Sequence, residues 1–436
     1  METSLSRRRL LGLAGAGAAA GGLVVAGAAL PVGIAGGTTD SGVEAKSDLV
    51  PFHGSHQAGI VTPAQAHAVV VGLDVVGSSG DLRVLLDRWS VAAARLAAGQ
   101  QVGERSPSSR LRPVDSGEAD DRSTARLTIT LGVGPTLFGT GGIGGTSDAD
   151  RFGLGERRPP ALTPLPAFAG DDLDPAVAGG DLCLQVCADD LQVALHAVRN
   201  LVRVGEGAVA VRWSHLGFGP PVGDRVGSGG GRSSHRNLLG FREGTSNLPP
   251  SSGELAEAVW VQPGDGADWM VGGSYLVLRH TRLDLAEWEA LNLLDRERVI
   301  GRHRRSGAPI SERDESAPLD LDAEGPDGRP VTDPRSHVAI AHRAAAGHPL
   351  HRRSYNLAPG VPQAEAAAGA DPLGAAAGLL FLAFCRDPAV QFVPVQQQLA
   401  AHDLLGAYTR TVASELFAVL PGLAEGSSWS TAFFDR

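Results

Sequence analysis

The chain has 436 residues, of which 43% are hydrophobic and 20% charged, a balance typical of globular rather than disordered proteins. At roughly 150 residues per domain, this length allows two or three domains. A net charge of -10, without a groove rich in Lys and Arg, argues against a nucleic-acid partner.

Residues 1–30 have the pattern of a twin-arginine export signal. Arg7, Arg8 and Arg9 precede a weakly hydrophobic run rich in Gly and Ala, and Ala26-Gly27-Ala28 offers a cleavage site of small residues. We therefore expect a periplasmic or extracellular protein, tethered to the membrane if the signal stays uncleaved. Because this route exports proteins that have already folded, it favours a cofactor loaded before export.

A linker over residues 31–60 leads into a first domain over residues 61–235. Its predicted strands and helices follow from alternating and helical hydrophobic spacing. They are a strand over 66–76, a helix over 80–98, a strand over 126–133, a long loop over 134–180, a strand over 181–187, a helix over 189–202 and a strand over 208–216. Two successive β-α-β patterns predict a ferredoxin-like α+β unit.

Residues 236–436 repeat this theme loosely and form the predicted second domain. We expect strands over 259–261, 273–279, 352–357 and 379–384, helices over 283–294 and 395–400, a largely helical segment over 404–420, and a charged loop over 301–350. The predicted fold class is therefore α+β, with two ferredoxin-like domains made of antiparallel sheets and flanking helices. Ligand clefts commonly lie where two domains meet, here near residue 235.

The three cysteines do not form a disulfide framework. Cys183 and Cys187 lie four residues apart on one predicted strand, about 13 Å along it, which is too far for a disulfide. Together with Cys385 they are expected to be small buried hydrophobic residues.

A carboxylate, Glu243, stands between two glycines in the segment from Arg236 to Asn247. Gly240 and Gly244 let the backbone turn tightly and approach a large ligand. A carboxylate presented from such a loop can take a proton from one atom and return it to another. A glycine-bordered surface turn remains the alternative at this point.

A second group of functional side chains begins about 100 residues later with His337 and Arg352. A neutral imidazole is a usual axial ligand of haem iron, and a guanidinium can stabilise charge that develops on a bound peroxide. Composition alone also allows solvated histidines and a basic patch. The spacing of the four histidines, His337, His342, His348 and His351, matches no standard zinc site.

Together these segments resemble the dye-decolorizing (DyP-type) haem peroxidases, in particular their twin-arginine-exported deferrochelatase/peroxidase branch. The resemblance covers nearly all of residues 50–430. The matching segments are 56–60, 236–247, 272–277, 297–302, 336–337, 352–355, 379–384, 386–388 and 391–396.

The resemblance implies a haem b pocket enclosed by the two domains. His337 takes the position of the axial iron ligand, Arg352 that of the distal arginine and Glu243 that of the distal acid. The family has Asp where this chain has Glu243, so we expect weaker or differently pH-tuned activity, not its loss.

Further haem contacts follow from the same resemblance. The backbone of Gly244, Thr245 and Ser246 matches a segment that lies against the haem. His342 and Arg343 match a segment at the haem edge. Asp387 is the candidate carboxylate that orients His337 through its second ring nitrogen, and its alternative role is a helix cap.

The resemblance implies a peroxidase that reduces hydrogen peroxide and oxidises dyes, phenols or other small reductants. A deferrochelatase that takes iron from haem is the first alternative, and it would fit iron-uptake partners at the membrane. A haem-binding protein with weakened catalysis is the second alternative. The sequence leaves a homo-oligomer open.

Overall fold

Nine antiparallel strands and the helices packed on them form the described part of the protein, which we analysed as a computed structural model. The structure describes residues 48–104, 108–139, 150–219, 235–243, 247–249, 252–358 and 377–435. The segment from Ser47 to the C-terminus is one compact unit, and the predicted export signal lies outside the described residues. Among these residues, no helix combines the length and the apolar character needed to cross a bilayer.

The N-terminal half is a βαββαβ unit. Its elements are β1 (His67–Val75), α1 (Ser79–Ala97), β2 (Thr128–Val133), β3 (Leu182–Ala188), α2 (Leu191–Val204) and β4 (Val209–Phe218). Their order across the sheet is β2-β3-β1-β4, and all pairings are antiparallel. This is the predicted ferredoxin-like arrangement.

Capping residues and apolar spacing explain the two helices of this half. Ser78 and Asp81 form a reciprocal capping box at the start of α1, and Asp190 caps α2. Leu82 and Leu85 lie on the face of α1 that packs against the sheet, where both are fully buried.

The C-terminal half has the same strand order. Its elements are α3 (Gly253–Val259), β5 (Ser274–Leu283), α4 (Leu285–Ala290), α5 (Leu293–Ile300), α6 (His337–Ala344), β6 (His351–Arg352), β7 (Tyr355–Leu357), β8 (Gly378–Cys385), α8 (Pro388–Gln391), α9 (Val393–His402), β9 (Thr409–Val419) and α10 (Trp429–Phe434). The order β9-β5-β8-β7 repeats that of the first half, with β6 also paired to β8. The predicted fold class is confirmed.

Five short 3-10 helices complete the description. They are η1 (Pro135–Phe138), η2 (Gly155–Arg157), η3 (Pro175–Val177), η4 (Asp268–Met270) and η5 (Leu404–Tyr408). η5 follows α9 directly, so the chain turns from helix into β9 within a few residues.

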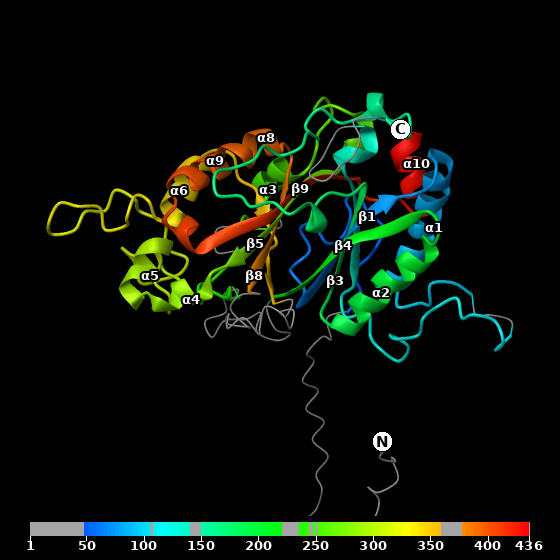
Figure 1. The fold of residues 1–436 in the computed structure, drawn as a ribbon, viewed down its shortest axis with the longest axis horizontal. Helices are drawn as coiled ribbons and strands as arrows, with labels where there is room; N and C mark the ends of the chain where they lie inside the picture. The colour runs from blue at the N-terminus through cyan, green and yellow to red at the C-terminus, as the bar shows by residue number, and fades with distance from the viewer. Residues whose placement is uncertain are drawn as a thin grey trace, which may run out of the picture. The chain divides into compact units, whose positions relative to one another are not determined.

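Two short seams join the halves into a closed ring of strands. β2 pairs with β9 at Gly132↔Val419 and Val133↔Ala418, and β4 pairs with β7 at Gly217↔Leu357 and Phe218↔Asn356. Because β5 also pairs with β8, eight strands close on themselves. Figure 1 shows α1, α2 and α10 on one side of the strands and α6, α8 and α9 on the other.

Several expectations for the second half were wrong. Residues 404–420 form η5 and β9 rather than a helix, because β9 is buried on both faces and therefore lacks the alternation that marks a strand. The expected helix over 283–294 breaks at Asn292, which caps α5, and the charged loop contains α6. Residues 259–261 end a helix instead of forming a strand.

Two buried layers and one smaller cluster form the core. One layer packs α1 and α2 on the outer face of the strands, and the other, with Val70, Trp213 and Phe417, is enclosed by the ring. Cys183, Cys187 and Cys385 are all buried and free, as expected. The smaller cluster, named here the Trp288 cluster, contains Leu239, Phe241, Leu283, Trp288, Val299, Ile300 and Ala377.

Titratable side chains are also buried on the strands. The rings of His215 on β4 and His280 on β5 lie 4.7 Å apart, and burial lowers their pKa values to about 3 and about 4. Glu415 on β9 is 5% exposed, and burial raises its pKa to about 7, against the opposing hydrogen bond from Gly179 and charge of Arg212.

Glu415 makes the stability depend on pH. The folded protein binds the Glu415 proton more tightly than the unfolded chain does. The stability gained from this proton is complete below the unfolded pKa of 4.5 and is lost as the pH rises through about 7. We predict that Glu415→Gln raises the free energy of unfolding by about 3 kcal/mol at about pH 9 and changes it little at about pH 5. Urea unfolding at both pH values measures this. An equal effect at the two values would contradict it.

Candidate active site

The loop that carries Glu243 is a tight hairpin. The Asn237 N–H donates to Phe241 O at 2.8 Å, and Oδ1 of Asn237 accepts from the Phe241 N–H at 3.0 Å. Gly240 has a φ of +89°, in the left-handed region that favours glycine. Leu239 and Phe241 anchor the hairpin in the Trp288 cluster, where Trp288 Nε1 donates to Leu239 O at 3.1 Å. These contacts fix the loop from which Glu243 extends.

The Glu243 carboxylate is held by its own loop. Asn237 Nδ2 donates to Oε1 of Glu243 at 2.7 Å, and the Glu243 N–H donates to His235 O at 2.8 Å. The side chain is half-buried and does not pair with Arg352. Gly244, Thr245 and Ser246 lie outside the described residues, so their haem contact stays a prediction.

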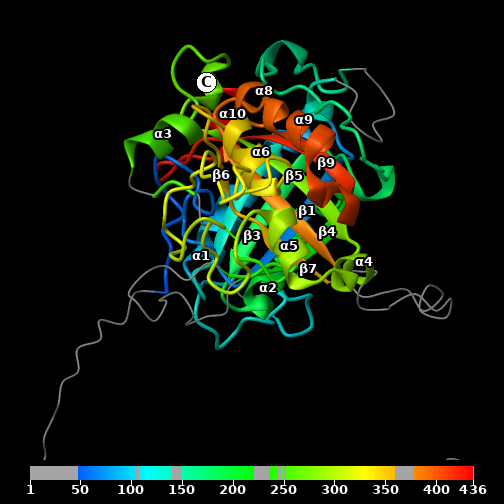
Figure 2. The same cartoon turned by 90° about the vertical axis from the view of Figure 1, so that its left-hand side faces the viewer.

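His337 is the first residue of α6. Ser336 caps the helix by accepting from the Ala339 N–H, and Gly301, at the end of α5, packs directly on Ser336. A Cβ at Gly301 would come within 2.7 Å of Ser336 Oγ, so the close approach requires glycine. Figure 2 looks onto this end of the molecule, with α5, α6 and α9 toward the viewer.

The partner of His337 is Asp403, the residue between α9 and η5. Nδ1 of His337 lies 2.6 Å from Oδ2 of Asp403, whose other oxygen accepts from the Leu405 N–H at 2.9 Å. A proton on Nδ1 leaves Nε2 as the free nitrogen, and no described side chain hydrogen-bonds it. The side chain of His337 is 35% exposed, whereas that of Asp403 is 7% exposed.

The prediction that Asp387 orients His337 was wrong. Asp387 caps α8, where its Oδ1 accepts from the Ala389 N–H at 2.9 Å. A Pro at the next position favours this cap, which was the alternative role. Asp403 was missed because 66 residues separate it from His337, and nothing local in the sequence marks the pair.

Asp403 also affects the pKa of His337. Burial lowers the pKa of His337, but the charge and hydrogen bond of Asp403, helped by the charge of Glu243, outweigh burial and raise it above the ordinary value. Arg352 opposes the increase. The charges of Glu243 and Arg352 thus both act on His337, and the roles of the three residues at one site stay a prediction.

Arg352 is held by Asn247, a second residue missed from the sequence. Asn247 Nδ2 donates to Arg352 O at 2.7 Å, and its Oδ1 accepts from the Arg352 N–H at 3.1 Å. The next residue, Arg353, points away and donates to Thr62 O and Gln65 Oε1. The two arginines of the pair therefore have different partners.

Two predicted haem-edge residues lie apart from this group. His342 and Arg343 are exposed and stand five and six positions after His337 on α6, on other faces of the helix. Their haem contact stays a prediction. Among the described residues no group of three or more His, Cys, Asp or Glu side chains could hold a metal ion.

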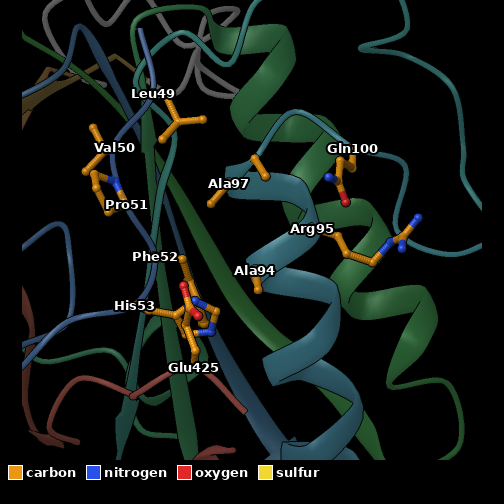
Figure 3. Close-up of a pocket in the computed structure, with 11 residues that line it drawn as sticks. Leu49, Val50, Pro51, Phe52, His53, Ala94, Arg95, Ala97, Gln100 and Glu425 are labelled. Carbon is orange, nitrogen blue, oxygen red and sulfur yellow. The ribbon is translucent and has the colours of Figure 1, made fainter. Parts of the chain in front are cut away.

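A cavity of about 380 Å³ lies elsewhere, at the C-terminal end of α1. Figure 3 shows Phe52, His53, Arg95 and Glu425 among its lining residues. None of the predicted site residues lines it, so we do not assign the reaction to this cavity.

The residues at His337 fit a haem. An axial histidine uses one nitrogen for iron and needs a hydrogen-bond acceptor on the other, and the His337–Asp403 pair has this form. Glu243 and Arg352 are a carboxylate and a cation, the residue types suited to carry a proton and to stabilise negative charge.

Comparison with known proteins identifies relatives along almost the whole chain. Residues 57–219 match the family model "Dyp-type peroxidase, N-terminal", and residues 234–424 match "Dyp-type peroxidase, C-terminal". The deferrochelatase of Escherichia coli K12 is 32% identical over 97% of this chain and 95% of its own length. The dye-decolorizing peroxidase of Thermobifida fusca is 36% identical over 85% of this chain and 81% of its own.

A solved structure is also similar to this chain over most of its length. Ferric DtpA from Streptomyces lividans is 36% identical, with a TM-score of 0.79 over 89% of this chain and 98% of that one.

We predict that Asp403→Asn lowers the pKa of His337, because burial would no longer be outweighed by a carboxylate. The imidazole is titrated by NMR in the ligand-free protein. Asp387→Asn is the matched control and should leave the His337 titration unchanged. Equal His337 pKa values in Asp403→Asn and wild type would contradict the assigned pair.

Proposed function

Because the chain belongs to the Dyp-type peroxidase family, we propose that it is a haem b peroxidase that reduces hydrogen peroxide and oxidises small reducing substrates such as phenols or dyes. The observation that supports this assignment best is the His337–Asp403 pair, with a free Nε2. Bound haem would supply an iron that takes up peroxide oxygen and passes oxidising equivalents to the reductant.

His337 would hold the iron through Nε2, while Asp403 fixes the ring orientation and makes the imidazole a stronger donor. Asp403 is itself fixed by the Leu405 N–H, so the ligand is oriented before the cofactor binds. Because the His337 ring is already oriented, less conformational entropy is lost when haem binds.

Glu243 would move the peroxide proton between the two oxygens, and Arg352 would stabilise the negative charge that develops as they separate. The hydrogen bond from Asn237 keeps Glu243 in its loop, so the longer stem of this residue does not fold onto Arg352. Asn247 fixes the backbone of Arg352 in the same way.

The named relatives also favour a second activity at the same pocket. Proteins called deferrochelatase match 97% of the chain. In that reaction iron leaves an intact porphyrin. Incubation of the protein with haem, followed by detection of iron-free porphyrin, distinguishes this activity from peroxide-driven oxidation.

We further propose export by the twin-arginine route, on the basis of Arg7, Arg8 and Arg9 ahead of the Gly- and Ala-rich run. A cofactor that is loaded before export fits this route.

We predict that His337→Ala abolishes or markedly shifts the Soret band of the haem-loaded protein, since the axial nitrogen is lost. His342→Ala, an exposed histidine on the same helix, is the control and should keep the wild-type spectrum. An unchanged spectrum in His337→Ala would exclude His337 as the ligand.

We predict that Glu243→Gln lowers the rate of peroxide consumption about 100-fold, the usual contribution of a positioned acid/base group. Glu243→Asp should retain catalysis but change its rate, because the shorter stem moves the carboxylate relative to Asn237. Stopped-flow mixing with peroxide measures both. A Gln variant as fast as wild type would show that Glu243 does not carry the proton.

A further inference from the structure

The chain between α5 and α6 contains an arm, residues 316–331, that stands away from the rest of the protein. No residue of the arm is buried, and none of its apolar side chains belongs to the core. Among the described residues, every hydrogen bond made by the arm joins two residues of the segment 314–331. Figure 1 shows the arm in the yellow loop that extends outward beyond α5 and α6.

A short hairpin forms the tip of the arm. The Val331 N–H donates to Ala323 O at 2.9 Å, and the Gly325 N–H donates to Arg329 O at 2.8 Å. A two-stranded hairpin that packs on no other element is at most marginally stable in water. Its free strand edges tend to pair with another chain. The arm therefore has the form of a segment that a partner covers.

The charge of the arm indicates the kind of surface that would cover it. Four acidic residues and one arginine give the arm a net charge of -3. Asp320, Asp322 and Glu324 are exposed and alternate with half-buried side chains, so the three carboxylates share one side of the arm. No cation in the described part of the chain forms an ion pair with any of the three. A basic surface would complement this side of the arm.

Such a basic surface lies near the base of the arm and is named here the Arg304 patch. It consists of Arg236, Arg304 and Arg305, which are all exposed. The Arg236 guanidinium donates to Arg304 O at 2.5 Å and to Arg305 O at 2.8 Å, which holds the three side chains on one surface. Within the described ranges, no carboxylate forms an ion pair with the patch, so the arm does not neutralise the patch of its own chain.

We propose that two copies of this chain form a dimer in which the arm of each copy lies on the Arg304 patch of the other. A two-fold axis makes the same contact twice, and it requires that both complementary surfaces lie on one side of the molecule. The arm and the patch meet this requirement, because only ten residues separate Arg305 from the start of the arm. The opposite charges also fix how the two copies are oriented.

This interface lies next to the candidate site. Glu315, just before the arm, pairs with Arg242 at 3.2 Å, and Arg242 precedes Glu243. After the arm, Asp333 O accepts from the Ser336 N–H at 2.9 Å, directly ahead of His337. A partner that holds the arm therefore restrains the chain on both sides of the site.

The first test measures the oligomeric state of the haem-loaded protein by sedimentation velocity at micromolar concentration. Wild type should be a dimer that high salt weakens, because the contact is between charged surfaces. Replacement of residues 317–330 by a short Gly-Ser linker should give a monomer, with circular dichroism to confirm that the variant is folded. A wild-type monomer, or a dimer that survives removal of the arm, would overturn the inference.

A second test exchanges charges between the two surfaces and does not require removal of the arm. Asp320→Arg/Asp322→Arg makes the arm basic like the patch, and Arg304→Glu/Arg305→Glu makes the patch acidic like the arm. Each double variant alone should dimerise at least about tenfold more weakly than wild type. Their mixture should form a mixed dimer, because each arm then meets a patch of opposite charge.

Arg88→Glu/Arg110→Glu is the matched control, since it reverses two exposed arginines of the N-terminal half and should dimerise like wild type. Formation of the mixed dimer would also show that neither charge variant is misfolded. A mixture of two folded variants that stays monomeric would exclude the contact between the arm and the Arg304 patch.

Discussion

The hydrogen bond between His337 and Asp403 is the constraint on which the site depends. It joins the start of α6 to the end of α9, and the described chain between these two helices forms β6, β7, β8 and α8. A 2.6 Å contact to a carboxylate that is 7% exposed fixes both the ring orientation and the nitrogen that remains free. The backbone on both sides must therefore be placed accurately before any ligand arrives.

The Trp288 cluster holds the backbone next to His337 and Asp403 in place. Its side chains come from the Glu243 loop, from β5 and from α4 and α5, and Val338, Leu404 and Leu405 pack against it. Val338 follows His337, and Leu404 follows Asp403. One apolar cluster thus supports the acid, the histidine and the partner of the histidine, so loosening it would disturb all three together.

Much of the fold followed from the sequence because the first half has clear alternation, good caps and helical spacing. The second half was harder for physical reasons. Because β9 is buried on both faces, its sequence lacks the alternation of a strand and was predicted to be helical. α6 is short and lies within a charged segment. For the site, the residue types and the family resemblance predicted from the sequence that His337, Arg352 and Glu243 act together. Asp403, Asn237 and Asn247 act through contacts that only the folded chain creates, and two of these contacts span 66 and 105 residues.

The two seams of the ring have a consequence for how the protein can vary. Every site residue described comes from the C-terminal half, yet that half closes its hydrogen bonding only through β2 and β4 of the other. Cut apart, each half would expose two unpaired strand edges, which tend to recruit other chains. The N-terminal half therefore covers both open strand edges of the half that carries the candidate site, and its sequence can vary only as far as those four backbone pairings allow.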